Sequence, residues 1–219
     1  MSDALLGSRR CACSGPHSPR LVVLTGGPGA GKTAVLEVAR RHCCEHVVVL
    51  PESASIVYGG GFPRLDALPA RRRAQIAILH VQDQMERLEL EMGRAALVLC
   101  DRGVLDGLAY WPDGSDAYYA ELGSSREALL ARYTSVIHLR TPGAGHGYDR
   151  ENRLRTESAD QAALLDEKIE RAYEGHPSRH FVPSSEGFVE KLRAALALID
   201  AHVPLCCRAS ATRPSSDAA

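Results

Sequence analysis

Short apolar runs that alternate with helical patterns predict an α/β fold, in which helices cover both faces of a mostly parallel five-stranded sheet. The first run leads directly into a glycine-rich turn, and acidic residues follow the second and third runs. The chain has 219 residues, enough for one such domain with a buried sheet. We therefore expect a three-layer α/β/α domain over residues 21–201, with a flexible leader at 1–20 and a disordered tail at 202–219.

The expected elements follow from apolar periodicity and from turn residues. The expected strands are residues 21–24, 47–50, 95–100, 135–140 and 180–182. Helices are expected up to residue 41 after the glycine-rich turn, and at 70–92, 104–110, 127–133, 158–175 and 188–199. Residues 53–61 are expected to form a loop or a short helix, and residues 111–123 a loop. In the long helix, steps of three and four predict a core face made of Ile78, Val81, Met85, Leu88 and Met92.

Residues 26–33, with the sequence GGPGAGKT, form the strongest motif in the chain. The spacing from Gly26 to Gly31-Lys32-Thr33 matches the phosphate-binding loop, and a strand and a helix flank it as that motif requires. Glycines let backbone amides approach an anion, and the helix N-terminus adds partial positive charge. Lys32 would reach the terminal phosphates and Thr33 would offer a hydroxyl to Mg²⁺. The expected nucleotide-binding residues are Gly26, Gly27, Pro28, Gly29, Ala30, Gly31, Lys32, Thr33 and Ala34.

Charged residues follow two of the expected strands. Asp101 comes directly after the third strand, where such folds place the carboxylate that orients Mg²⁺; a solvated carboxylate or a helix cap is the alternative. Glu52 ends the second strand, at the edge that faces the ligand crevice in open parallel sheets. It could accept a proton from an acceptor hydroxyl or position a water, or merely cap the next helix. Arg102 could bind an anionic group of an acceptor or cap a loop.

A glycine-rich break at residues 142–147 precedes three arginines, Arg150, Arg153 and Arg155. Arginines on a mobile segment can close over a transferring phosphoryl group, whereas a solvated charged loop is the alternative. We expect this lid to be mobile without ligand. His138 is expected to be a packed core histidine and His176 a turn residue.

Composition narrows the function classes. A formal net charge of −1 provides no general attraction for nucleic acid, and no apolar run is long enough to cross a bilayer. The N-terminus lacks the apolar segment of a secretion signal, so a cytoplasmic location is expected. Of seven cysteines, Cys11, Cys13, Cys206 and Cys207 could supply four thiolates to zinc, but both pairs lie in the expected leader and tail. Reduced free thiols are the prediction.

The phosphate loop, Asp101-Arg102-Gly103 and the arginine-bearing segment resemble the P-loop kinase superfamily. The segments VVVLPESAS, QDQMERLE, VLCDRGVLDGLAYWP and RENRLRTESADQAALLDEKIERAYEGHP are similar to a family of small AAA-type ATP-binding proteins. That family is related to the ribosylnicotinamide kinase domain and to the TRPL-translocation-defect protein. The resemblance covers residues 21–199. It implies a P-loop NTPase fold and a bound nucleotide, but it says little about which substrate the protein uses. A ring-forming motor is not expected.

These observations together predict phosphoryl transfer from ATP, with GTP as the alternative nucleotide, to a hydroxyl of a nucleoside-like or other small metabolite. Lys32, Glu52, Asp101 and Arg155 are the expected catalytic residues, and Thr33 and Asp101 the expected Mg²⁺ ligands. The acceptor is expected to contact Glu52, Arg102, Arg150 and Arg153. The competing hypothesis is a regulatory ATPase or GTPase that binds a partner according to its nucleotide state.

Overall fold

The structure, a computed structural model, describes residues 11, 13, 16–141, 159–184 and 187–208. Its centre is a five-stranded sheet in the order β2-β3-β1-β4-β5. All four strand pairs are parallel, which confirms the expected α/β class. The strands are β1 (Arg20–Thr25), β2 (Val47–Leu50), β3 (Leu97–Asp101), β4 (Tyr133–Leu139) and β5 (Arg179–Val182).

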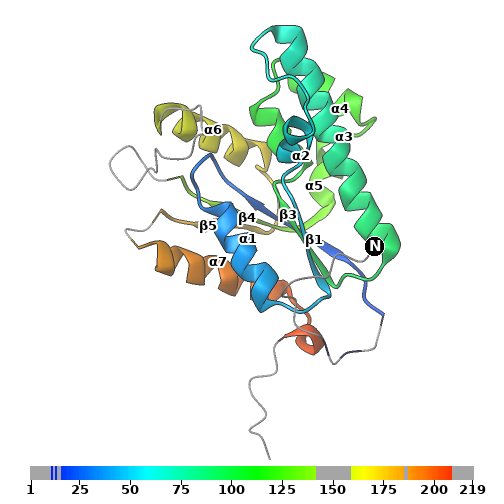
Figure 1. The fold of residues 1–219 in the computed structure, drawn as a ribbon, viewed down its shortest axis with the longest axis vertical. Helices are drawn as coiled ribbons and strands as arrows, with labels where there is room; N and C mark the ends of the chain where they lie inside the picture. Colours follow the sequence, from blue (N-terminus) through cyan, green and yellow to red (C-terminus); the bar gives the residue numbers. More distant parts are fainter. Residues whose placement is uncertain (1–10, 12, 14–15, 142–158, 185–186, 209–219) are drawn as a thin grey trace, which may run out of the picture.

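Helices connect these strands and form the two outer layers (Figure 1). In chain order they are α1 (Lys32–His42), α2 (Ser53–Gly59), α3 (Leu68–Met92), the 3-10 helix η1 (Val104–Ala109), α4 (Ser115–Glu121), α5 (Arg126–Ala131), α6 (Ala159–Ala172), α7 (Phe188–His202) and the 3-10 helix η2 (Leu205–Cys207). None of the helices in the described part of the chain has the length and apolarity that a membrane span requires.

Alternate residues of the central strands face opposite layers, because side chains alternate along a strand. Val22 and Leu24 of β1 pack with α1 and α7, whereas Leu21 and Val23 pack with α3, η1, α5 and α6. Figure 1 shows the sheet between these two groups of helices. Each of the four side chains is at most 1% exposed, so the central strand β1 is buried on both faces of the sheet.

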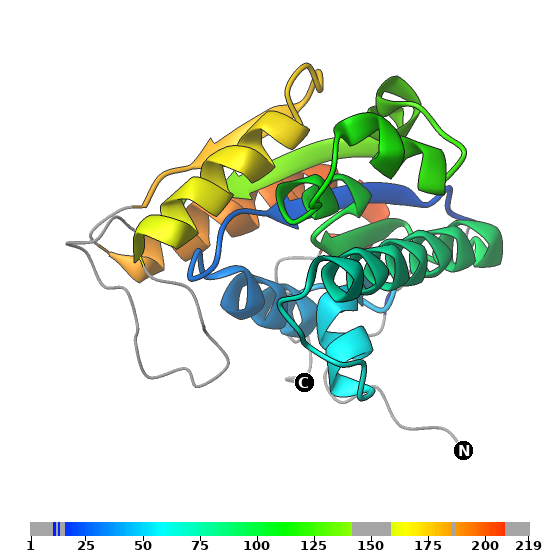
Figure 2. The same cartoon turned by 90° about the horizontal axis from the view of Figure 1, so that it is seen from above.

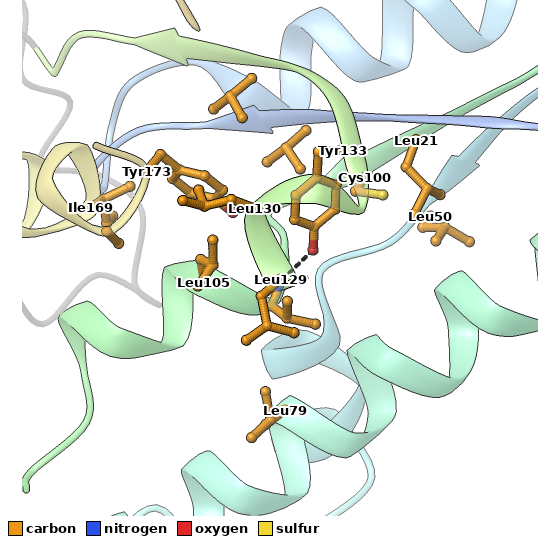
Figure 3. Packing of buried hydrophobic residues seen from close by; sticks show 14 of the residues in the cluster. Leu21, Leu50, Leu79, Cys100, Leu105, Leu129, Leu130, Tyr133, Ile169 and Tyr173 are labelled. Atoms are coloured by element: carbon orange, nitrogen blue, oxygen red, sulfur yellow. Dashed lines mark hydrogen bonds between the residues drawn. The ribbon is translucent and has the colours of Figure 1, made fainter. Parts of the chain in front are cut away.

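The layer that contains η1 is the richer in aromatic residues. Tyr133, Tyr173 and Leu105 belong to this cluster, and the Tyr133 hydroxyl accepts a hydrogen bond of 2.8 Å from the Val104 amide (Figure 3). On this face η1 lies between α6 and α3 (Figure 2). The packing fixes the segment after Asp101, and with it the residues that follow β3.

Two local expectations are wrong. Residues 111–123 are not all loop, because α4 forms within them. The helix expected to reach residue 133 ends earlier: α5 ends at Ala131, and Tyr133 already belongs to β4. Tyr118 explains α4: it is 1% exposed, packs edge-on against Trp111 at 5.4 Å between ring centroids, and donates a hydrogen bond to Val104 O. Tertiary burial of one tyrosine therefore overrides the local turn signals.

The buried face of α3 also differs from the expectation. Leu88 and Met92 are exposed, and Ile78, Val81 and Met85 are only partly buried. The buried residues of α3 are Ala74, Leu79, Gln82, Asp83 and Glu86. Three of these five are polar. Asp83 and Glu86 pair with arginine and tyrosine side chains from neighbouring elements, and Gln82 donates to Glu86 and to the Arg102 carbonyl. Apolar periodicity alone therefore points to the wrong face.

The polar face of α3 has specific partners. Arg132 Nη1 donates a hydrogen bond of 2.7 Å to Asp83 Oδ1. Arg132 Nη2 lies 2.9 Å from Glu86 Oε2, which is an ion pair without a hydrogen bond. Glu86 Oε1 accepts hydrogen bonds from Gln82 Nε2 and the Tyr133 hydroxyl, each at 2.9 Å. Burial raises the pKa of Glu86 to about 7, although the charge of Arg132 acts in the opposite direction.

The C-terminal segment departs from the expected disorder after residue 202. Helix η2 follows α7, and Cys207 is buried against Cys43, Cys44 and Val203. Val203 and Cys207 thus join the core cluster beside α1, whereas Leu205 between them is exposed.

Candidate functional site

The sheet topology opens a crevice beside β1. The chain leaves the carboxyl end of β1 for α1, and β1 lies between β3 on one side and β4 on the other. In open parallel sheets such a point, where the strand order reverses, forms the ligand crevice. Residues 26–31 occupy that position, between Thr25 and Lys32.

The glycines of the loop lie where side chains would not fit. Gly26 has a φ of 133°, and a Cβ there would collide with Leu139 O. A Cβ on Gly27 would lie 2.5 Å from the Thr141 hydroxyl. Gly31 precedes α1 with a φ of 91°, and no side chain caps the helix N-terminus. The loop backbone therefore packs directly against the end of β4, with the positive end of α1 behind it.

Lys32 lies inside this loop. Its Nζ donates hydrogen bonds to Gly26 O at 2.9 Å and to Gly27 O at 3.0 Å. Burial lowers the pKa of Lys32 to about 8, and the charge of Arg102 acts in the same direction. The ammonium group is thus held in a position where an anion would stabilise its charged form.

Asp101 supplies a carboxylate to the same crevice. Burial raises its pKa to about 6, opposed by the charge of Lys32. Its Oδ1 is buried and has no hydrogen-bond partner among the residues that the structure describes. Thr33, the next residue after Lys32, is exposed on the first turn of α1. An unpartnered carboxylate oxygen and a hydroxyl are the hard oxygen donors that Mg²⁺ prefers, so these residues fit that ion.

Arg102 links the third strand to the phosphate loop. Its backbone has a φ of 70°, the only positive φ of a non-glycine residue in the described ranges. The guanidinium donates from Nε to Glu52 Oε1 at 2.7 Å and from Nη1 to Gly26 O at 3.3 Å. Burial favours the neutral form of Glu52, but the charge and hydrogen bond of Arg102 outweigh it and hold the Glu52 pKa below its usual value. Such backbone strain is typical of functional positions.

Asp106 is a site residue that the sequence analysis missed. Its Oδ1 accepts from the Thr25 hydroxyl at 2.5 Å and from Arg102 Nη1 at 3.3 Å. Its Oδ2 accepts from the Gly103 amide at 3.0 Å and from the Tyr173 hydroxyl at 2.7 Å. The spacing of four between Arg102 and Asp106 is no helical signal, because Arg102 precedes η1 and has a φ of 70°.

Asp166 is a second missed residue, and it lies on α6. Its Oδ1 accepts a hydrogen bond of 2.7 Å from the Gly27 amide and lies 2.9 Å from His138 Nε2. Burial opposes ionisation of Asp166, but the hydrogen bond to His138 lowers its pKa to about 2. His138 is buried, as expected for a core histidine. No local sequence pattern marks Asp166, because its partners are far away in the chain.

The structure therefore brings together most of the expected site. Lys32, Glu52, Asp101 and Arg102 surround the loop that begins at Gly26. The expected lid residues Arg150, Arg153 and Arg155 lie outside the described residues.

A separate hollow lies between η1, α4, α5 and α6, where Leu108, Trp111, Tyr119 and Lys168 line it. It shares no lining residue with the phosphate loop, with Glu52 or with Asp101. The crevice beside β1 is therefore the candidate site for phosphate chemistry.

Comparisons with known proteins bear on the family and the fold. The model of a family described as an AAA domain matches residues 21–191. No curated protein matches the chain in sequence. Among solved structures, a deoxyadenosine kinase from M. mycoides, determined with the products dCMP and dCDP, is similar over 83% of this chain and 99% of that chain. The identity is 14% and the TM-score is 0.53, so the similarity concerns the fold.

Proposed function

The chain belongs to the AAA domain family, and from that premise we propose that it is an ATP-dependent kinase for a hydroxyl of a nucleoside-like small molecule. The observation that carries this proposal is the position of Arg102, which joins the Glu52 carboxylate to the Gly26 carbonyl of the phosphate loop. A carboxylate suited to bind an acceptor hydroxyl therefore lies beside a loop suited to bind phosphates. The fold shared with a deoxyadenosine kinase supports this class of acceptor.

The loop and its neighbours would bind the nucleotide. The amides of the loop and the N-terminus of α1 would receive the phosphates, with Lys32 near the terminal ones. Thr33 and Asp101 would hold Mg²⁺, which when bound neutralises charge on the phosphate oxygens. The unpartnered Asp101 Oδ1 supports this assignment, because a buried carboxylate oxygen without a partner is otherwise costly.

Glu52 would orient the acceptor. Its pKa lies below the usual value, so the side chain is ionised at neutral pH and can accept a hydrogen bond from a hydroxyl. As the acceptor oxygen takes the phosphoryl group and ADP departs, the hydroxyl proton passes to this carboxylate. A weak base suffices, because a loose phosphoryl-transfer transition state depends mainly on positioning and charge. Arg102 holds Glu52 in place through the bond of 2.7 Å.

The arginines at 150, 153 and 155 remain a proposal from the sequence. Arg155 is assigned to the transition state, and Arg150 and Arg153 to the acceptor or its developing charge. Closure of these arginines over the phosphates would also exclude water and limit wasteful hydrolysis of ATP.

A two-part assay tests the proposal. Thermal shift with MgATP against nucleosides, deoxynucleosides and related hydroxyl compounds identifies binding acceptors, because a ligand specific to the native state raises the apparent stability. ADP release and the product mass are then measured for each acceptor. ADP release that depends on an acceptor supports a kinase. Release at the same rate with every compound and with none would instead favour the regulatory nucleotide switch.

Two variants and a matched control assign the roles. Lys32→Ala is expected to abolish turnover while the unfolding midpoint stays near that of the wild type. Glu52→Gln is expected to lower kcat about a hundredfold or more, with the KM for ATP nearly unchanged. The matched control is Glu37→Gln, because Glu37 is exposed on α1 and its ion pair is with Arg41 at the surface. Wild-type turnover in Glu52→Gln would remove this residue from the mechanism.

A further inference from the structure

A cluster of cysteine and histidine side chains lies at the edge of the sheet opposite the phosphate loop. Cys13 and His17 precede β1, His46 lies in the turn just before β2, and Cys207 ends η2. The amino ends of the strands meet at this edge, whereas the phosphate loop follows the carboxyl end of β1. In Figure 1 η2 (orange-red) lies below the C-terminal end of α1.

The four ligand atoms lie at nearly equal separations. Cys13 Sγ lies 3.3 Å from His17 Nε2, 3.2 Å from His46 Nδ1 and 3.6 Å from Cys207 Sγ. Cys207 Sγ lies 3.5 Å from His17 Nε2 and 3.6 Å from His46 Nδ1. The two imidazole nitrogens lie within 4.8 Å of each other.

These separations match a tetrahedral metal centre. With Zn–S bonds of about 2.3 Å and Zn–N bonds of about 2.0–2.1 Å, a tetrahedron has edges of about 3.8 Å between sulfurs and about 3.5 Å between sulfur and nitrogen. The distances from Cys13 and Cys207 agree with those edges to within about 0.3 Å. We propose that Cys13, His17, His46 and Cys207 bind one structural Zn²⁺ ion.

Two further cysteines lie next to this set. Cys11 Sγ lies 3.0 Å from Cys13 Sγ, and Cys11, Cys44, His46 and Cys207 form a second group whose ligand atoms lie within 4.8 Å of one another. We assign the first group, because its five measured edges are near tetrahedral and because it uses both imidazoles. A disulfide would need only two of the sulfurs and would leave the two histidine rings, 4.7 Å apart between centroids, without a role.

The proposed ion would join three segments that are far apart in the chain. Cys13 and Cys207 are separated by 194 positions, and His46 comes from a third element. Four protein ligands leave no open position, which is the arrangement of structural rather than catalytic zinc sites. The site differs from the four-thiolate set that the sequence suggested, because two histidines take the places of Cys11 and Cys206. It also does not depend on the proposed kinase activity, since it lies at the opposite edge of the sheet.

Metal analysis of adjacent cysteine variants tests the site. The full chain, purified with reductant and without chelator, is expected to carry about one zinc ion per chain by plasma mass spectrometry. Cys207→Ser is expected to bring the zinc content near zero, whereas Cys206→Ser, its exposed neighbour, is expected to keep it. Wild-type protein without zinc, or Cys207→Ser with undiminished zinc, would overturn the proposal.

Spectroscopy on the wild-type protein avoids the risk that a variant fails to fold. X-ray absorption is expected to show two sulfur and two nitrogen neighbours at zinc, at about 2.3 Å and about 2.0 Å. Three sulfurs and one nitrogen would overturn the assignment in favour of the group with Cys11 and Cys44. A zinc chelator is expected to lower Tm, and added Zn²⁺ to restore it. An unchanged Tm in both steps, or a disulfide in the intact mass, would also overturn the proposal.

Discussion

Replacing Asp106 with asparagine tests the network that fixes Arg102 beside the phosphate loop. The side chain is 3% exposed, and its two carboxylate oxygens accept hydrogen bonds from four donors. Asparagine keeps the shape but turns one of these acceptors into an NH₂ group. Two donors therefore lose their acceptor, whichever way the amide is oriented.

The expected cost follows from these contacts. Each buried donor without an acceptor costs about 1–3 kcal/mol, so two of them cost about 2–6 kcal/mol. Loss of the negative charge leaves Arg102 with Glu52 as its remaining ion pair in this cluster, which adds to the cost. We expect the free energy of unfolding to fall by about 4 kcal/mol, a large share of the 5–15 kcal/mol of a typical domain.

Urea unfolding followed by circular dichroism measures this change. Asp113→Asn is the matched control, because Asp113 pairs with Arg72 at the surface and its loss is expected to change little. Tyr173→Phe removes one of the donors to Asp106, so the double variant is expected to be less destabilised than the sum of the two single variants. A fall of less than about 0.5 kcal/mol in Asp106→Asn, with an unchanged m-value, would refute the reasoning.

Three other predictions concern the loop, the polar face of α3 and the lid. Gly26→Ala is expected to abolish MgATP binding in calorimetry, because its Cβ would collide with Leu139 O at a φ of 133°; binding of wild-type strength would contradict the tight packing. Burial raises the pKa of Glu86 from 4.5 to about 7, so the native state holds a proton that the unfolded state releases, and stability falls as the pH rises between these values. Glu86→Gln is expected to remove about 2–3 kcal/mol of this fall in the free energy of unfolding. If urea titrations give the same difference in unfolding free energy between variant and wild type at pH 5 and at pH 8, Glu86 is not the origin of the pH dependence. Arg155→Ala is expected to lower turnover much more than ATP affinity, and equal losses in steady-state kinetics and in binding would argue against a role confined to the transition state.

The sequence by itself determined the α/β class and predicted the centre of the candidate site. Gly26, Lys32 and Asp101 could be predicted because the phosphate loop is a contiguous motif and because a carboxylate that ends a parallel strand lies at the crevice edge. Glu52 followed from the same rule. These inferences need only neighbours in the chain and the repeat of strands and helices, which local periodicity records.

The tertiary structure alone decided which distant groups complete the site. Thr25 and Asp106 are 81 positions apart, and Gly27 and Asp166 are 139 apart. The polar face of α3 and the cluster around Cys207 depend in the same way on which elements pack together. Hydrogen bonding and ion pairing require contact in space, and a polar side chain becomes favourable in the interior only when its partner arrives there. A sequence pattern records the polarity of a position but not its partner, so these parts of the protein emerge only from the folded chain.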